Sequence, residues 1–502
     1  MGQISKGAIL SYVQIFLTFV IGLIYTPILI KFLGKTDYGL YSLVISLVSY
    51  LSLMDMGLGN AIVRYISKNR IDGNKSYEAK LLGFFLKFYL IIGIVTLILG
   101  INISFFSSEI FGGSLNSTEV QNIKWMIFIL SINFSFAFIL NVFTAAIHAY
   151  ERFVFLKILN IIKLILAPIL TVILLINGGG LIGITIITTS VNMIVLLIGY
   201  FYAKKYLKIK VKLESIDKKI YKEIYFYSFF IFISALADRL YWQTDQILLG
   251  ILESPQIVAI YAIGIQLVMI FASLSTAISN LYLPKITQLV ITNDSSKHIN
   301  RLFNDVSRYQ FIILSLFFSG FIIFGKRFIE IWVGNDFIEA YLIIVIIMIP
   351  FFVELIQNVA FSLMQAKGVY YFRAIALVIS AILNLLISIP IIKNYGMIGT
   401  AIVTSVFIAI VNILVMNFFY HYKLGLNMVF YWKNTIFNIF KLSPLICSFY
   451  VFLNNYSYKN NFIYFIYIFI YTSLFFIIVY KFILNKSEKT LVTDKLKRLL
   501  KE

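Results

Sequence analysis

The sequence has few charged residues, which make up only 13% of its 502 positions. A soluble domain carries charge on roughly a quarter of its residues and uses that charge to cover its surface. Acidic residues are the scarcer kind, with 22 Asp and Glu against 42 Lys and Arg, while 61% of the chain is hydrophobic. This composition excludes water as the main solvent of the chain and indicates lipid.

Residues that form disulfides or bind metals are also rare. The single cysteine, Cys447, excludes an intramolecular disulfide. The three histidines, His148, His298 and His421, fall in or beside different predicted loops and lack the spacing of metal ligands. We therefore expect neither a metal site nor a cofactor.

The sequence lacks the features of a cleavable signal and of a nucleic-acid interface. The first apolar run, 8–30, is too long for a signal sequence and no small-residue cleavage site follows it, so we expect it to be the first span. The net charge of +20 is concentrated at 204–222 and 486–501, without an aromatic-interleaved binding module. We expect both clusters to face anionic membrane lipids and predict no nucleic-acid partner.

The chain is rich in apolar runs that could each cross a hydrocarbon core of roughly 30 Å as a helix. About fourteen such spans are predicted, near 8–30, 40–64, 81–103, 123–147, 154–176, 181–203, 224–250, 259–283, 309–325, 338–363, 373–392, 396–420, 435–453 and 461–483. Roughly 30 of the Lys and Arg residues then lie on one side, which predicts cytoplasmic termini by the positive-inside rule. The expected fold is an all-α integral membrane protein.

An internal repeat organises the predicted spans. The pair LG at 33–34 returns at 249–250, and GLIG at 180–183 returns as GMIG at 396–399. Both matches, and that of Lys157 with Arg373, have an offset of about 216 residues, as expected of a duplicated helix set. We predict an N-terminal six-helix lobe (1–203), a basic cytoplasmic linker (204–223), a C-terminal six-helix lobe (224–420), two additional transmembrane helices (421–483) and a basic cytoplasmic tail (484–502).

Ionisable residues inside the predicted spans are the site candidates, because a charge in hydrocarbon is costly unless it faces a bundle interior or a hydrated cavity. The candidate substrate-binding cations are Arg239, Lys163, Arg64 and Lys87, and the candidate charge partners or coupling residues are Asp55, Asp238, Asp245 and Glu354. Arg239 either anchors a substrate or pairs with the adjacent Asp238. For Lys163 the alternative is that its long side chain snorkels to the membrane interface. Snorkelling is the stronger interpretation for Lys87, and a role as an interfacial anchor is the stronger one for Arg64. Cations in such a lumen suit a phosphate or pyrophosphate group.

Several motifs resemble those of a known family. They are KFLG at 31–34, DYGLY at 37–41, DMGLGN at 55–60 and RY at 64–65, followed by 245–250, WVG at 332–334 and NYGMIGT at 394–400. Over most of the first twelve spans the sequence is similar to the polysaccharide transport family, the Wzx-type oligosaccharide flippases of the MOP superfamily, which also holds the MATE exporters and the lipid II flippases.

The resemblance implies two six-helix lobes in a MATE-like arrangement with two added helices. It implies a flippase of the bacterial plasma membrane, not an enzyme, that carries a polyprenyl-pyrophosphate-linked oligosaccharide to the outer leaflet for O-antigen or capsule synthesis. Polysaccharide polymerase and glycosyltransferases would be its partner enzymes. Basic lumen residues hold the anionic headgroup in such flippases, which would give Arg239 and Lys163 that role.

Two other functions stay open from the sequence. A MATE-like exporter of small organic compounds would use the same architecture. A membrane glycosyltransferase or polymerase would also have many helices, but it needs catalytic carboxylates near a large outer loop, and the predicted outer loops are short.

Overall fold

The computed structural model describes residues 3–214, 216–292, 296–369, 371–455, 461–486 and 488–490. These residues form helices joined by short connections, and no strand occurs among them. A helix pairs its backbone groups internally, so it leaves none to face lipid. The predicted all-α class is confirmed.

Residue contacts divide the chain into two compact units. Unit 1 comprises Met1–Ala262 and Leu377–Thr400, and unit 2 comprises Ile263–Ala376 and Ala401–Glu502. The predicted lobes and linker have other boundaries and stay a prediction. Most of the predicted tail lies outside the described residues, which include only 484–486 and 488–490 of it.

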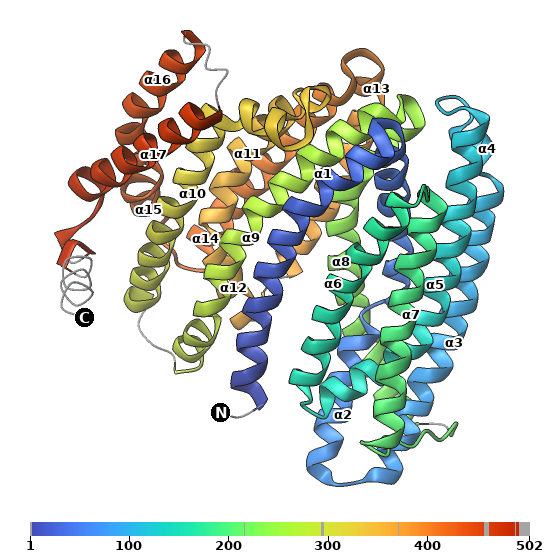
Figure 1. Cartoon of the computed structure of the whole chain (residues 1–502). Helices are drawn as coiled ribbons and strands as arrows, with labels where there is room; N and C mark the ends of the chain where they lie inside the picture. Colours follow the sequence, from blue (N-terminus) through green and yellow to red (C-terminus); the bar gives the residue numbers. More distant parts are fainter. Residues whose placement is uncertain are drawn as a thin grey trace. The chain divides into compact units, whose positions relative to one another are not determined.

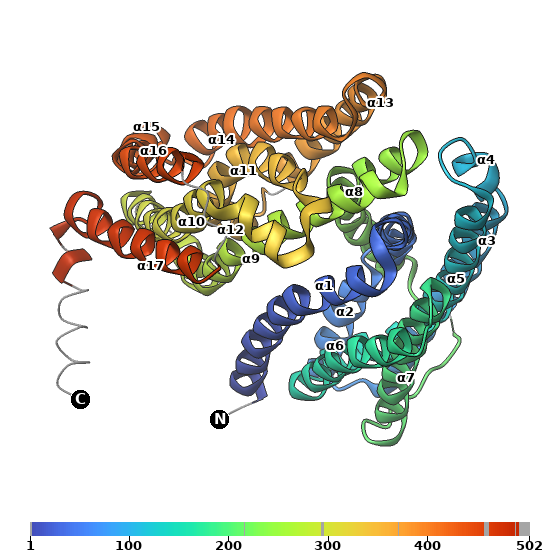
Figure 2. The ribbon, with the colours of Figure 1, turned by 45° about the horizontal axis from the view of Figure 1, so that its top comes forward.

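Unit 1 is built mainly from the helices of the first half of the chain (Figure 1). These are α1 (Gln3–Leu51), η1 (Ser52–Asp55), α2 (Leu58–Asp72), α3 (Lys75–Phe105), α4 (Ser107–Phe111), α5 (Ser117–Ala149), α6 (Phe153–Ile176), α7 (Leu181–Lys205) and α8 (Lys218–Leu252). Helix α5 lies between α3 and α7 and packs on both (Figures 1 and 2). Its start is fixed by a capping box, in which Asn116 and Glu119 satisfy each other's backbone amide.

Unit 2 takes its helices from the second half of the chain. These are α10 (Ser296–Val333), η2 (Asn335–Phe337), α11 (Ala340–Ile356), α12 (Asn358–Ala366), η3 (Ala409–Val415), α14 (Met416–Tyr422), α15 (Met428–Asn434), η4 (Ile436–Asn438), α16 (Ile439–Asn455), α17 (Asn461–Ile478) and η5 (Val479–Ile483). Helices α9 (Pro255–Ile291) and α13 (Tyr371–Ile408) contribute to both units.

Eleven helices in the described part of the chain are long and apolar enough to cross a membrane, or twelve if the bent pair α11 and α12 counts as one span. The protein is therefore a multi-pass membrane protein. The count falls below the predicted fourteen because two pairs of predicted spans lie in continuous helical runs, Ile9–Asp72 and Tyr371–Tyr422. Between the two predicted spans of each run lies a glycine with non-helical backbone, Gly34 at φ 76° and Gly396 at φ 56°.

Close contact between α3 and α5 depends on small residues. A Cβ added to Gly93 would lie 2.8 Å from the Ser135 carbonyl oxygen, and one added to Gly100 would overlap the Ser131 side chain. The opposite face of α3 exposes large apolar side chains such as Ile94. Helices in lipid associate through such small-residue surfaces and leave their bulky residues to the acyl chains.

The connection between α7 and α8, residues 206–217 and hereafter the linker, is attached to α3. The Lys212 amide donates to the Ala79 carbonyl at 2.9 Å, and Lys87 Nζ donates to the Leu213 carbonyl at 3.0 Å. Lys80 forms an ion pair with Glu214 at 2.8 Å. Residues 212–214 of the linker are thus bound to α3.

Candidate functional site

A cavity of about 780 Å³ lies within unit 1. It is lined by residues of α1, η1, α5, α6, α7 and α8. Its volume is in the range of small-molecule sites, which span about 300–1,000 Å³. Its walls combine aromatic and aliphatic side chains with amides, hydroxyls and ionisable groups.

The cavity has an excess of positive charge. Lys157, Lys163 and Arg239 line it, and Asp55 is the one carboxylate among its described lining residues. In the described part of the chain none of these three cations forms an ion pair. A cation without a fixed counter-charge remains available to an anionic ligand.

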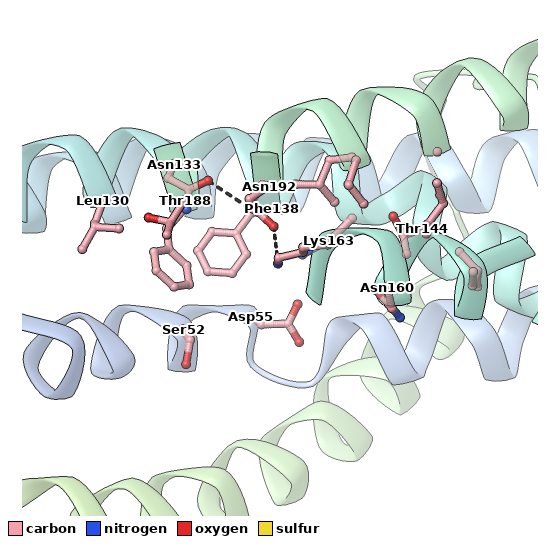
Figure 3. Close-up of a pocket in the computed structure, with 18 of the residues that line it drawn as sticks. Ser52, Asp55, Leu130, Asn133, Phe138, Thr144, Asn160, Lys163, Thr188 and Asn192 are labelled. Atoms are coloured by element: carbon pink, nitrogen blue, oxygen red, sulfur yellow. Dashed lines mark hydrogen bonds between the residues drawn. The ribbon is translucent and has the colours of Figure 1, made fainter. Parts of the chain in front are cut away.

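Lys163 is held by a chain of two amides from two neighbouring helices (Figure 3). Its Nζ donates to Asn192 Oδ1 at 2.5 Å, and Asn192 Nδ2 donates to Asn133 Oδ1 at 2.9 Å. Both partners are neutral, so they orient the ammonium group and leave its charge uncompensated. The arrangement joins α6, α7 and α5 around one cation.

Asp55 lies on the opposite wall, at the end of η1 (Figure 3). It accepts a hydrogen bond from the Tyr89 hydroxyl at 2.5 Å. The residue lies just before Gly57, which precedes the first turn of α2. Its carboxyl group is thus already engaged by a donor from α3.

Arg239 reaches the cavity from α8. The Tyr50 hydroxyl of α1 donates to the Arg239 carbonyl at 3.2 Å and shares a hydrogen bond with the Thr244 hydroxyl at 2.6 Å. These contacts fix the backbone of α8 against α1. They leave the guanidinium side chain free to line the cavity, and it has no hydrogen-bond partner among the described residues.

Lys157 and His148 form the end of the cavity near the α5–α6 connection. Lys157 Nζ donates to Gln14 Oε1 at 3.3 Å, again a neutral partner. The His148 ring packs edge-on against Phe153, with ring centroids 5.0 Å apart. Neither residue was among the sequence-predicted site residues.

The other predicted cations lie away from this cavity. Arg64 is exposed and stacks over the Tyr227 ring at 4.8 Å, which joins α2 to α8. Lys87 is exposed and binds the linker carbonyl described above. Neither residue lines the cavity. The structure therefore brings together Arg239, Lys163 and Asp55 of the predicted set.

The remaining predicted acids have other surroundings. Asp245 is 4% exposed and accepts a hydrogen bond from the Tyr261 hydroxyl at 2.6 Å, which joins α8 to α9. Asp238 is exposed on α8 and does not line the cavity. Glu354 lies in unit 2, where it forms an ion pair with Arg373 at 2.7 Å and accepts from Asn412 at 2.8 Å.

Sequence reasoning missed the polar residues that α5 contributes to the site. Asn133, Asn141 and His148 recur at seven- or eight-residue spacing along α5 and all line the cavity. That spacing places the three residues on one face of the helix, and this pattern could have identified them from the sequence. A buried pair in unit 2, Arg308 with Glu488 at 2.9 Å, was also missed.

The arrangement can hold an anion without covalent chemistry. Lys and Arg donate strong hydrogen bonds to phosphate oxygens, and they act more strongly in a cavity shielded from water. The described residues contain no group of three or more His, Cys, Asp or Glu side chains able to hold a metal ion.

Comparison with known proteins identifies the family. Residues 4–290, more than half of the chain, match the family described as "Polysaccharide biosynthesis protein". The chain is 20% identical over 381 residues to a "Putative O-antigen transporter" of Shigella flexneri, covering 74% of this chain and 87% of that protein.

Solved structures show the same fold. The lipid II flippase MurJ in an inward closed conformation matches with a TM-score of 0.74 and 18% identity, covering 94% of this chain and 98% of MurJ. An inward-facing multidrug resistance MATE transporter of the MOP superfamily matches with a TM-score of 0.58 and 14% identity, covering 82% and 96%. The chain therefore belongs to the polysaccharide biosynthesis protein family, and it has the fold of the MurJ flippase and of the MATE transporters.

Proposed function

We propose that this protein is a flippase that moves a polyprenyl-pyrophosphate-linked oligosaccharide, the repeat unit of a surface polysaccharide, from the cytoplasmic to the outer leaflet of a bacterial plasma membrane. The observation that carries the proposal is the cationic cavity of unit 1. Lys157, Lys163 and Arg239 line it without ion-pair partners in the part of the chain that the structure describes, and Asp55 is engaged by the Tyr89 hydroxyl. A pyrophosphate supplies the negative charge that this cavity lacks.

The family and the relatives support a lipid-linked glycan as the cargo. The Shigella relative carries the name of an O-antigen transporter, and MurJ carries the name of a lipid II flippase. The cavity holds the headgroup and adjacent sugars in this proposal, while the polyprenyl tail stays in lipid. Polymerase and glycosyltransferases are the proposed partner enzymes.

Fourteen crossings and alternating access complete the proposal. A helical run of 64 residues, Ile9–Asp72, would be about 96 Å long if straight, several times the hydrocarbon thickness. We propose that this run and Tyr371–Tyr422 each cross twice, turning at Gly34 and Gly396. That even count puts both termini on one side, which the positive-inside rule makes the cytoplasmic side, and it agrees with two six-helix lobes and two added helices.

The headgroup assignment is tested by removing single charges in cells that depend on this protein for surface glycan. Lys163→Met and Arg239→Met each remove a charge-assisted contact worth about 1.5–3 kcal/mol, so we expect export to fall roughly tenfold or more. Lys163→Arg keeps the charge and should retain more activity than Lys163→Met. Quantified surface polysaccharide, at matched protein level, is the measurement.

Lys68→Met is the matched control, because Lys68 is exposed on α2 and does not line the cavity. Export should be unchanged in this variant. Normal export by both Lys163→Met and Arg239→Met would remove the cavity from the transport path.

The alternative of a MATE-like exporter is favoured by the shared fold. Deletion of the gene separates the two functions. Loss of surface glycan with unchanged susceptibility to organic cations supports the flippase, whereas increased drug susceptibility with normal glycan supports the exporter. A cavity with excess cations is a poor site for cationic drugs.

A further inference from the structure

Beside Lys163 the cavity contains polar groups that have no hydrogen-bond partner among the described residues. Asn141, Thr144 and Asn160 line the cavity, and their side chains make no hydrogen bond with any described residue. Asn141 and Thr144 are half-buried and Asn160 is exposed. In contrast, Asn133 and Asn192 are occupied by each other and by Lys163.

These three residues, hereafter the amide cluster, lie to one side of Lys163. Asn160 precedes Lys163 by three residues on α6, a rise of about 4.5 Å, and Asn141 precedes Thr144 by the same interval on α5. Figure 3 shows Asn160 and Thr144 beyond Lys163, at the opposite end of the drawn cavity from Leu130. The cluster thus begins about one helical turn from Lys163 along α6.

The chemistry of the amide cluster suits an uncharged polar ligand. Each amide offers a carbonyl acceptor and an NH₂ donor, and a hydroxyl both donates and accepts, so they can pair with adjacent sugar hydroxyls or an acetamido group. The cluster itself contains no formal charge and lies between two cations, because Lys157 and Lys163 are each three residues from Asn160 on α6. Phe134 and Phe138 also line the cavity and offer apolar surface to the faces of a sugar ring.

We propose that Asn141, Thr144 and Asn160 bind the first sugar next to the pyrophosphate, and that this contact selects which lipid-linked glycan is carried. The inference rests on the proposed function, in which Lys163 holds the pyrophosphate. A site built to hydrogen-bond a ligand rejects analogues that leave its polar groups unpaired. The amide cluster therefore sets specificity, and the cations supply affinity that is common to all cargoes.

The test compares lipid probes with and without one sugar. The full-length protein in nanodiscs is titrated with undecaprenyl pyrophosphate alone, and with the same lipid carrying one glucose or one N-acetylglucosamine. We expect at least one sugar-bearing probe to bind about tenfold tighter than the bare lipid. Asn160→Leu, and separately the near-isosteric pair Asn141→Leu with Thr144→Val, should remove that preference and leave binding of the bare lipid unchanged.

Three results would overturn the inference: no preference of the wild-type protein for either sugar, a preference retained by both variants, or a parallel loss of bare-lipid binding in both. Asn160→Leu keeps the test valid if the double variant unfolds, because Asn160 is exposed. Failure of the proposed function is distinct, since the wild-type protein would then bind none of the probes. Lys163→Met should weaken binding of all probes alike.

Discussion

At the residue scale, the cations of this protein differ in whether their charge is compensated. The predicted repeat matches Lys157 with Arg373, yet Lys157 contacts a neutral glutamine and Arg373 contacts Glu354. Arg373 also lies over the Phe361 ring at 4.7 Å. The uncompensated cations thus line the cavity of unit 1, whereas the cation at the related position of unit 2 is neutralised locally.

Arg308 and Glu488 form the most enclosed ion pair that the structure describes. Both side chains are 9% exposed, and Arg308 also donates to the carbonyl oxygens of Asn434 and Ile483. Burial alone raises the pKa of the Glu488 carboxyl, but hydrogen bonds from Arg308 and the Asn485 amide outweigh it and hold the pKa below its usual value. The pair joins α10 to the segment after η5.

Acidification should weaken this attachment. Because the folded pKa of Glu488 is depressed, the stabilisation is present above the reference pKa of 4.5 and is lost as the pH falls through the lower, folded value. Glu488→Gln should lower the free energy of unfolding at pH 7 by about 1.5–3 kcal/mol and reduce its loss on acidification. Thermal unfolding of the purified protein between pH 7 and pH 3.5 measures both effects.

Glu214→Gln provides the control, since Lys80 also lowers the pKa of Glu214, but that carboxyl is exposed. Solvent screens such surface pairs, so the substitution should leave the unfolding temperature unchanged. Equal pH dependence in the Glu488→Gln variant and the wild-type protein would contradict the assignment.

At the element scale, the sequence was informative about single helices. Long apolar runs predicted the spans because a helix in lipid needs only length and composition. The same signal could not show that Gly34 and Gly396 interrupt continuous helical runs, since one residue at positive φ changes neither property. From the sequence alone, a loop between two spans therefore could not be distinguished from a kink within one continuous helix.

Contacts between helices were less predictable. Lys163 was selected because a cation inside a span is costly, and that argument holds for one helix alone. The same argument selected Lys87, whose partner is the linker, and Arg64, whose partner is Tyr227. Asn133 and Asn192 carry no charge and became part of the site only when α5, α6 and α7 met.

The contact between α3 and the linker gives a prediction for one element. A Cβ on Gly83 would overlap the Lys212 carbonyl, so Gly83→Ala should displace the linker and destabilise unit 1. We expect a cost of about 1–3 kcal/mol, as for other forced overlaps in packed regions. Faster proteolysis of the linker and a lower unfolding temperature would show it.

Gly113→Ala is the comparison variant, because nothing lies within 4 Å of a Cβ built there. It should behave as the wild-type protein. A Gly83→Ala variant with an intact linker and normal stability would show that the backbone accommodates the methyl group without cost.

At the scale of the whole molecule, the number of crossings decides where the two ends lie. An even number places both termini on one side, and the excess of basic residues predicts the cytoplasmic side. Single cysteines at Lys6→Cys and Lys486→Cys, introduced with Cys447→Ser, should react with an impermeant maleimide only in inside-out vesicles. A cysteine at Gly113→Cys should react in intact cells.

Labelling of the Lys6 and Lys486 positions from opposite sides would exclude fourteen crossings and, with it, the arrangement of two equally oriented lobes. Labelling of all three positions from one side would also contradict the proposal. Cys447 is exposed, so its replacement is needed for a clean background.

The attachment of the linker to α3 has a consequence for how the gene could be divided. The Lys212 and Leu213 backbone groups bind α3, so this stretch behaves as a structural part of the first coding segment. A split gene with its junction after codon 217 would keep that stretch with its own partner helix. A junction before codon 212 would place Lys212 and Leu213 on the second polypeptide and separate them from Ala79 and Lys87 of α3, which bind them.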